Sequence, residues 1–226
     1  MCGRYTLKRP RRLPLEGLDD TELFPVVPRY NIAPGQSILA IVQRAAEREA
    51  ALLKWGLIPS WSKEDKGFIN ARAETLQTKP SFQEAFQRRR CLILADGFYE
   101  WKKLGKERQP YYFQMKDEAL FCFAGIWDEW QRGSVSIISC AIITTIPNEM
   151  LAPIHNRMPV ILPPESQDLW LNDESTPVKL RNLLAPFPAS EMKSHPVSKA
   201  VNHPKNDNHD LVVRVDAELG MTPSLF

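Results

Sequence analysis

Cys2 is the residue of this sequence whose type and position are best suited to covalent chemistry. It stands in a polar stretch directly after Met1, followed by Gly3. If the initiator methionine is removed, Cys2 carries an α-amine and a thiol on one residue, with reference pKa values of roughly 8 and roughly 8.5. Such an aminothiol captures an aldehyde as an imine, and the sulfur then closes onto the imine carbon to give a five-membered thiazolidine. Cys2 therefore predicts a covalent centre, although an ordinary small second residue is the simpler alternative.

A second segment could orient the reacting groups. Asn70, Arg72 and Glu74 alternate along the sequence, so a strand or extended loop would place them on one face. The Asn70 amide offers both a donor and an acceptor for an amine or a sugar oxygen, and Arg72 is suited to bidentate contact with phosphate. The competing interpretation is a structural ion pair beside a turn.

A third segment offers a proton-transfer group. Alternation along a strand would place Phe98 and Glu100 on one side, with Tyr99 and Trp101 on the other. Aromatic neighbours desolvate a carboxylate and raise its pKa, which suits a general acid and base. We therefore predict that Glu100 has this role, with a salt-bridged surface glutamate as the alternative.

The fourth segment contains His155, which follows Pro153 and precedes a basic residue and a strand-like run. Histidine changes its charge most easily near neutral pH, so His155 could protonate a ring oxygen and open a closed sugar to its aldehyde. A histidine that satisfies backbone groups of its loop is the alternative.

Short β-rich runs bounded by turn residues must position these side chains. Strands are predicted over residues 37–43, 51–55, 91–95, 98–102, 111–115, 120–127 and 135–144. We expect most of them to pair into one antiparallel, partly closed sheet, with a hairpin loop at residues 103–106. Helices are predicted over residues 81–90, beginning with a Ser81 cap, and over residues 164–171 and 178–184. The expected fold class is α+β, a single β-rich domain over residues 1–226 with a few short helices.

Composition limits the classes of protein that remain. The chain has 226 residues, of which 43% are hydrophobic and 25% charged, and no apolar run approaches the roughly 18 residues of a membrane span. We expect a soluble cytoplasmic protein without a signal or transit peptide. Cys91, Cys122 and Cys140 lie in apolar runs and are predicted to be buried thiols, and no cysteine or histidine spacing indicates a metal site.

The net charge of +2 is uninformative about a polyanionic partner, because electrostatic attraction of such a partner depends on local patches of basic residues. Basic residues do cluster at residues 8–12 and 88–90. Each cluster fits either a patch for a polyanion or an ordinary solvated face.

Seven ordered motifs together resemble the SRAP family, the SOS-response-associated peptidases. They are MCGRY at residues 1–5, RYNIAPG at 29–35, WGLIP at 55–59, INARAET at 69–75, DGFYEW at 96–101, IHNRMP at 154–159 and HPVS at 195–198. The resemblance covers residues 1 to about 206. The loop 62–67 has its own sequence, with one channel aromatic where some members carry two, and residues 211–226 match no motif of the family.

The resemblance implies a positively charged groove for single-stranded DNA, in which the mature Cys2 forms a thiazolidine with the aldehyde of an abasic site. By motif, Asn70 positions the amine, Glu100 is the acid and base, and His155 assists sugar opening and adduct reversal. The positions that the resemblance places at DNA are Arg4, Asn31, Pro34, Trp61, Arg72 and Thr144. It also implies a DNA-repair protein without a cofactor, a monomer, associated with the nucleoid when bound to DNA. A peptidase or lyase-type activity is implied too, through which the same centre could remove Met1, although a housekeeping aminopeptidase would serve equally well.

Two other functions remain compatible with the residues. In an amidohydrolase, the Cys2 thiol would attack a carbonyl while Asn70 supplies an oxyanion donor, which leaves Arg4 and Arg72 without a role. In a non-covalent nucleic-acid binding module, Cys2 would be incidental.

Overall fold

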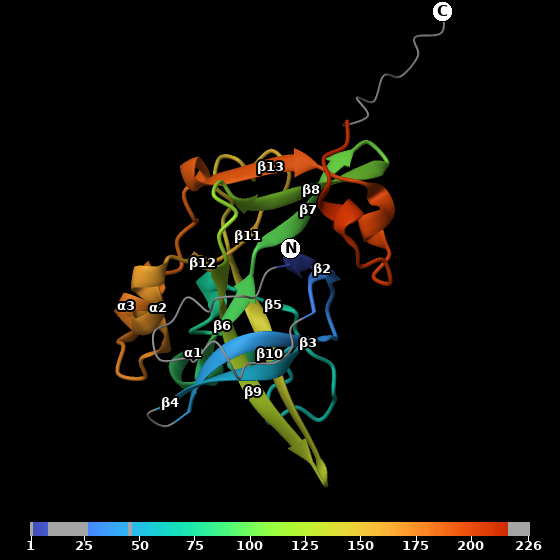
Figure 1. The fold of residues 1–226 in the computed structure, drawn as a ribbon. Helices are drawn as coiled ribbons and strands as arrows, with labels where there is room; N and C mark the ends of the chain where they lie inside the picture. The colour runs from blue at the N-terminus through green and yellow to red at the C-terminus, as the bar shows by residue number, and fades with distance from the viewer. Residues whose placement is uncertain (1, 9–26, 45–46, 217–226) are drawn as a thin grey trace, which may run out of the picture.

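The structure is a computed structural model that describes residues 2–8, 27–44 and 47–216. Its strands form two sheets, one above the other in Figure 1, and the N-terminal segment enters between them. The class predicted from the sequence, a single β-rich domain with a few short helices, is confirmed. The strands divide between two sheets, however, where the sequence favoured one.

The smaller sheet has five strands and contains the N-terminal segment at its interior. Its strands, in spatial order, are β13 (Met192–Pro196), β8 (Glu107–Met115), β7 (Gly97–Leu104), β1 (Tyr5–Leu7) and β2 (Arg29–Ile32). All four pairings are antiparallel. β1 is therefore held on both sides, which fixes the chain that leads back to Cys2.

The larger sheet has eight strands and is partly closed. Its main path is β11 (Met158–Pro159), β10 (Val135–Thr145), β4 (Glu47–Trp55), β3 (Ser37–Arg44), β6 (Arg90–Ala95), β9 (Phe121–Arg132) and β12 (Ile161–Leu162), and β5 (Asn70–Arg72) pairs with β10. Because β9 also pairs with β10, the order closes into a barrel-like ring. β4 and β5 both run parallel to β10, and these two pairings depart from the antiparallel expectation.

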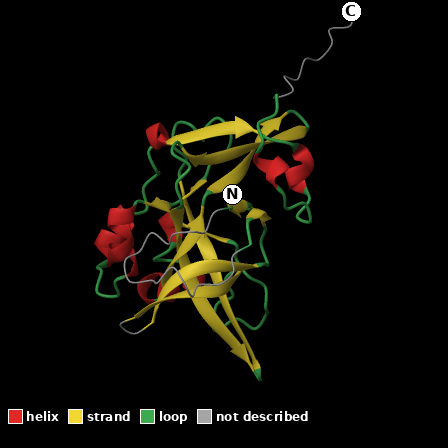
Figure 2. Cartoon of the chain, in the orientation of Figure 1, coloured by secondary structure: helices red, strands yellow, loops and turns green. Residues whose placement is uncertain are grey.

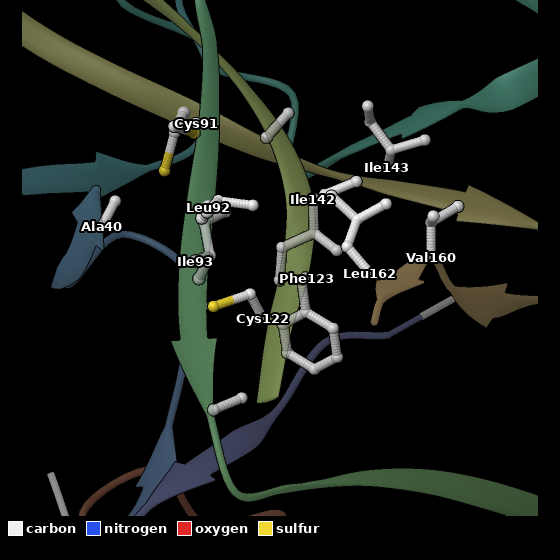
Figure 3. Close-up of a cluster of buried hydrophobic side chains, with 14 of the residues drawn as sticks. Ala40, Cys91, Leu92, Ile93, Cys122, Phe123, Ile142, Ile143, Val160 and Leu162 are labelled. Atoms are coloured by element: carbon white, nitrogen blue, oxygen red, sulfur yellow. The ribbon is translucent and has the colours of Figure 1, made fainter. Parts of the chain in front are cut away.

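The hydrophobic core fills this ring and continues to the smaller sheet. All six residues of β6 are buried, and side chains from β6, β9 and β10 interdigitate in Figure 3. Cys91 and Cys122 point their sulfur atoms among apolar side chains there. Cys91, Cys122 and Cys140 are fully buried, which confirms that prediction.

Helices lie at the periphery of the strands (Figure 2). They are α1 (Pro80–Arg88), α2 (Pro164–Leu171), α3 (Pro177–Asn182) and the 3₁₀ turns η1 (Ala73–Thr75), η2 (Ala189–Glu191), η3 (Lys199–Asn202) and η4 (His209–Val212). None of the helices in the described residues is long and apolar enough to span a bilayer.

Several element bounds differ from the sequence prediction for local reasons. α1 begins at Pro80 with Lys79 as its N-cap and no side-chain cap, so the predicted Ser81 cap is wrong; proline suits the first helical turn because its missing N–H is not needed there. Arg90 begins β6 because its backbone pairs with Ile126 of β9, and its buried guanidinium donates to the carbonyl oxygens of Trp170 and Phe86. The hairpin between β7 and β8 turns at Gly105, with φ +59°, so both strands are longer than predicted.

The basic cluster predicted at residues 8–12 lies outside the described residues except for Lys8, as do residues 217–226 of the tail. The described part of the tail is attached to the fold. Leu211 is buried against Tyr99 and Tyr112, and the Val215 amide donates to the Pro196 carbonyl at 3.0 Å. Residues 197–215 thus cover the outer face of the smaller sheet.

Candidate active site at the junction of the two sheets

Cys2 reaches the junction because β1 pairs with β7. Tyr5 is in register with Phe98, and the Tyr99 amide donates to the Arg4 carbonyl at 3.0 Å. The antiparallel pairing with β7 therefore continues beyond the start of β1 toward Cys2. The Cys2 side chain is fully buried. The same pairing brings Cys2 beside the middle of β7, where Glu100 lies.

A buried polar cluster locks β1 in this position. The Thr6 hydroxyl lies 2.6 Å from Asp96 Oδ1 and 2.9 Å from the Tyr112 hydroxyl. Gly97 permits this approach, since a Cβ there would lie 2.0 Å from the Tyr112 hydroxyl oxygen. Thr6 and Asp96 are both buried, so these hydrogen bonds are shielded from water and specify one position of β1.

Asn70 joins the site from the larger sheet. It begins β5, which is aligned in parallel with β10 so that Asn70 lies opposite Ile142. Its Nδ2 donates to the Cys2 carbonyl oxygen at 2.9 Å. Its Oδ1 is buried and has no hydrogen-bond partner among the described residues. The amide thus holds the Cys2 main chain and presents an unused acceptor beside it.

Glu100 is 1% exposed, and burial raises its pKa to about 7. A hydrogen bond from the Trp101 backbone partly offsets this effect. As predicted from alternation, Phe98 packs into the main core while Tyr99 and Trp101 face the smaller cluster beneath residues 197–212. Burial also raises the pKa of the Cys2 thiol, and the nearby Glu100 carboxylate raises it further.

His155 lies in the loop between β10 and β11. Its Nδ1 accepts a hydrogen bond from the Arg157 amide at 3.1 Å, so the proton of the neutral ring is on Nε2. In the cationic form Nδ1–H can donate instead to the Arg157 carbonyl oxygen at 3.2 Å. Partial burial lowers the His155 pKa, and the positive charges of Arg108 and Arg157 act in the same direction. The ring is therefore predominantly neutral at neutral pH.

Arg157 is a structural part of the site that the sequence reasoning did not assign. Its guanidinium donates two hydrogen bonds to the Glu74 carboxylate, at 2.6 and 2.9 Å, and another to the Thr144 carbonyl oxygen. Its side chain is 12% exposed. The ion pair between Glu74 and Arg157 joins η1, the turn that follows β5, to the loop that contains His155. The two motifs that contain Glu74 and Arg157 were recognised, but only the fold shows that they meet.

Arg4 and Asn31, two residues expected at DNA, form an internal clamp. Arg4 Nη1 donates to Asn31 Oδ1 at 2.9 Å and to the Val201 carbonyl at 2.6 Å. Asn31 is fully buried, and its Nδ2 lies within 3.2 Å of the carbonyl oxygens of Val201, His203 and Asn206. These contacts attach residues 201–206 to β1 and β2.

The remaining residues expected at DNA differ in exposure. Pro34 and Arg72 are exposed, and Trp61 is 63% exposed. Thr144 is buried, and its carbonyl oxygen is bound by Arg157. In the described residues there is no group of three or more histidine, cysteine, aspartate or glutamate side chains that could hold a metal ion.

The chain is similar to known proteins over most of its length. The family model of the SOS response associated peptidases (SRAP) matches residues 1–204. The chain is 43% identical to "Abasic site processing protein YoaM" of Bacillus subtilis over 96% of this chain and 99% of that protein. It is 32% identical to "Abasic site processing protein YedK" of Escherichia coli, over 94% and 99% respectively.

Solved structures share the fold. A crystal structure of a protein from Bacteroides thetaiotaomicron superposes with a TM-score of 0.74 at 30% identity, covering 82% of this chain and 85% of that one. Another, from Bordetella bronchiseptica, has a TM-score of 0.71 at 25% identity and covers 87% and 100%. With a family model over nearly the whole chain and relatives above 30% identity, the protein belongs to the SOS response associated peptidase (SRAP) family.

Proposed function

We propose that this protein processes abasic sites in DNA by capturing them covalently through Cys2 after Met1 is removed. The proposal rests first on one observation: Cys2, Asn70 and Glu100 converge from two different sheets. The names of the relatives, abasic site processing proteins, support the substrate. The acting group is the aminothiol of Cys2, and the target is the aldehyde of the open deoxyribose.

In the first step the Cys2 amine adds to the aldehyde carbon and forms a carbinolamine. Asn70 supports this step because its Oδ1, buried and without a partner among the described residues, can accept an N–H of that amine. Protonated Glu100 then gives its proton to the departing hydroxyl, which leaves as water, and an iminium remains. A pKa of about 7 lets Glu100 hold this proton at neutral pH.

In the second step the Cys2 sulfur closes the ring. The thiol is neutral at physiological pH because burial and the Glu100 carboxylate raise its pKa. The Glu100 carboxylate formed in the first step takes the thiol proton while sulfur bonds to the iminium carbon. The product is a thiazolidine with a neutral ring nitrogen, and Glu100 is again protonated. One water is lost overall.

His155 serves the opening of the closed sugar. Its lowered pKa makes the imidazolium the stronger acid: His155, once protonated from solvent, gives its Nε2 proton to the sugar ring oxygen while the anomeric hydroxyl loses its proton to solvent, and the imidazole returns to its neutral form. The Arg157 backbone fixes the ring on its Nδ1 side. Reversal of the adduct would use the same groups in the opposite order.

Single-stranded DNA would lie across the exposed residues of the junction. We assign direct contacts to Pro34, Trp61 and Arg72, since their side chains are accessible. Arg72 provides a phosphate contact, and Trp61 a surface on which a base can stack. Arg4, Asn31 and Thr144, which make internal hydrogen bonds, would support the path of the DNA. We also propose that the protein acts as a monomer.

The test is to incubate the protein with single-stranded DNA that carries one abasic site and to separate the products on a denaturing gel. The wild type should give a heat-stable crosslink. Cys2→Ala keeps an N-terminal amine but lacks the thiol, so it should give a product only when borohydride reduces the imine. Glu100→Gln should crosslink more slowly with nearly unchanged DNA binding.

A heat-stable crosslink that persists in Cys2→Ala would contradict the assignment of Cys2. The absence of any crosslink in the wild type would contradict the function itself. A large loss of DNA binding in Glu100→Gln would give Glu100 a structural role in place of proton transfer.

A further inference from the structure

A cavity of about 730 Å³ lies at the C-terminal end of α1, where this helix meets β3, β9 and α3. We call it the α1 cavity, and its lining includes Arg44, Arg88, Arg89, Trp127 and Leu180. Its volume is in the range of pockets that hold small molecules. None of the described residues that line it is proposed to act on an abasic site.

The length of β6 separates the α1 cavity from the strand that positions Cys2. Arg90, which follows the lining residue Arg89, begins β6, and Asp96 directly follows the end of this strand. The Asp96 backbone N–H donates to the Thr6 carbonyl oxygen of β1 at 2.9 Å. Arg90 and Asp96 are about 20 Å apart along the extended chain. The α1 cavity is therefore distinct from the site of Cys2.

Two buried donor atoms of the lining residues have no acceptor among the described residues. One is the indole Nε1 of Trp127, a residue that is 8% exposed, and the other is Nη2 of Arg89. The two residues are neighbours, because the Trp127 backbone N–H donates to the Arg89 carbonyl oxygen at 2.8 Å. A buried donor without an acceptor costs free energy, and both of these groups can only donate. A ligand that supplies acceptor oxygens to them would be stabilised there.

Guanidinium groups dominate the charge of the lining. Arg44 and Arg88 are exposed, and the guanidinium carbon of Arg44 lies 5.3 Å from the centroid of the Trp127 ring. Asp173 is the one acid among the described lining residues. It is already paired, since its Oδ1 lies 3.2 Å from Nη2 of the buried Arg90. The lining thus favours a negatively charged ligand.

Carboxylates outside the lining pair with two of these arginines without saturating them. Glu49 lies 2.9 Å from Arg44 Nε, but both side chains are more than 40% exposed, and such surface pairs contribute little. Arg89 lies 3.1 Å from Glu84 and 3.2 Å from Asp128 through Nη1 and Nε, which leaves Nη2 without an acceptor. An anion with several oxygens could therefore bind without breaking a buried ion pair.

The rest of the lining determines what the anion would carry. Phe86 and Leu180 are buried apolar side chains of the lining, and Pro177 is exposed beside them. A phosphate offers more acceptor oxygens to several guanidinium groups than a carboxylate does, and arginine binds it through paired hydrogen bonds. The cavity is also larger than a phosphate alone requires, and its apolar side suits the sugar and base of a nucleotide.

We propose that the α1 cavity binds a nucleotide phosphate at a site separate from Cys2. Arg44, Arg88 and Arg89 contact the phosphate oxygens, and the Trp127 indole N–H donates to one acceptor of the ligand. This inference gives a role to the basic cluster at residues 88–90 and does not depend on covalent capture. A free nucleotide and a nucleotide of a DNA strand offer the same phosphate, and the experiment distinguishes these two sources.

The experiment is isothermal titration calorimetry of the full chain with deoxyadenosine monophosphate, and with deoxyadenosine as the ligand that lacks the phosphate. The proteins are the wild type, Arg88→Gln, Trp127→Phe and Arg181→Gln. Arg181 is the matched control, because it is an exposed arginine of α3 that does not line the α1 cavity. Unfolding curves verify that each variant is folded. Fluorescence anisotropy then measures how the wild type and Arg88→Gln bind undamaged single-stranded DNA.

The wild type should bind one deoxyadenosine monophosphate per chain, and deoxyadenosine at least roughly tenfold more weakly. Arg88→Gln should weaken binding of the monophosphate roughly tenfold to a hundredfold, because it loses a charge-assisted hydrogen bond. Trp127→Phe keeps an aromatic ring without the N–H and should weaken binding roughly twofold to tenfold. Arg181→Gln should bind as the wild type does. A loss of DNA affinity in Arg88→Gln would assign the cavity to the DNA strand, and unchanged DNA affinity to a free nucleotide.

Several results would overturn the nucleotide site. They are no binding of the monophosphate by the wild type, equal binding of deoxyadenosine, and unchanged affinity for the monophosphate in Arg88→Gln or in Trp127→Phe. An equal loss in Arg181→Gln would show that the monophosphate responds only to the general charge of this face. A short peptide of glutamates that binds where the monophosphate does not would assign the cavity to an acidic protein segment instead.

Discussion

At the scale of single residues, Glu100 combines deep burial with a proton that it can release near neutral pH. Its pKa of about 7 lies well above the ordinary value of 4.5, chiefly because burial disfavours the carboxylate. Such a shift is also a statement about stability, since the folded state prefers the protonated form more strongly than the unfolded chain does. The residue proposed to transfer protons should therefore make folding depend on pH.

The sign of that dependence is fixed by the direction of the shift. Below about pH 4.5 both states hold the proton, and the stabilising preference of the folded state is fully present. It is lost as pH rises through 7, for a total of up to about 3 kcal/mol. Glu100→Gln cannot ionise, so its unfolding free energy relative to the wild type should increase by up to about 3 kcal/mol between pH 4.5 and pH 8.

Urea unfolding at both pH values measures this difference, with the exposed residue Glu129 changed to glutamine as the control. If the two proteins differ in unfolding free energy by the same amount at both pH values, the pKa of Glu100 is not raised in the folded protein.

The sequence singled out the candidate residues for chemistry because their types and motifs carry that information. It did not show which side chains bond to one another, because hydrogen bonds between residues far apart in the sequence leave no local pattern. Asn31 illustrates this: it was expected to line the DNA channel, and the structure places it in a buried clamp with Arg4. The ion pair between Glu74 and Arg157 joins residues 83 positions apart and could be found only from the fold.

At the scale of elements, the position of β1 against β7 decides whether Cys2 meets Glu100. That position depends on Gly97, where the Tyr112 hydroxyl approaches the backbone and binds Thr6. β1 has three residues and β5 has three, too short for a periodic pattern to reveal. The long strands of the larger sheet were predicted because they are apolar runs, whereas the parallel pairing of β5 with β10 required the structure.

Gly97→Ala should destabilise the protein by about 2–4 kcal/mol, because the new Cβ would displace the buried Tyr112 ring. A double-mutant cycle with Tyr112→Ala, followed by urea unfolding, isolates this contact. In the Tyr112→Ala background Gly97→Ala should cost much less. Strictly additive changes in unfolding free energy would show that the Tyr112 hydroxyl is not what excludes a side chain at residue 97.

At the scale of the whole molecule, the two sheets contribute different parts of one site. The smaller sheet carries Cys2 and Glu100, and the larger one carries Asn70 and the loop of His155. Neither sheet alone brings together the groups proposed to act on the abasic site. The sequence indicated the single β-rich domain, but the division into two sheets depends on long-range pairing that local patterns do not encode.

The exposed cations around the junction should dominate non-covalent binding of DNA. Arg72→Ala should weaken binding of single-stranded DNA to a similar extent for all sequences, because a phosphate contact carries no base information. It should also reduce the slope of log affinity against log salt by about 0.7. Titrations at several salt concentrations measure this, and an unchanged slope would remove Arg72 from the DNA contacts.

The mass of the covalent product tests whether Cys2 captures abasic DNA after Met1 is removed. After incubation with abasic single-stranded DNA, intact-mass spectrometry should show one species: protein without Met1 plus the oligonucleotide, less one water. Digestion should place the DNA on the peptide that begins at Cys2, with no free thiol on that residue. A product that retains Met1, or an adduct mapped to a lysine, would contradict covalent capture by the Cys2 aminothiol.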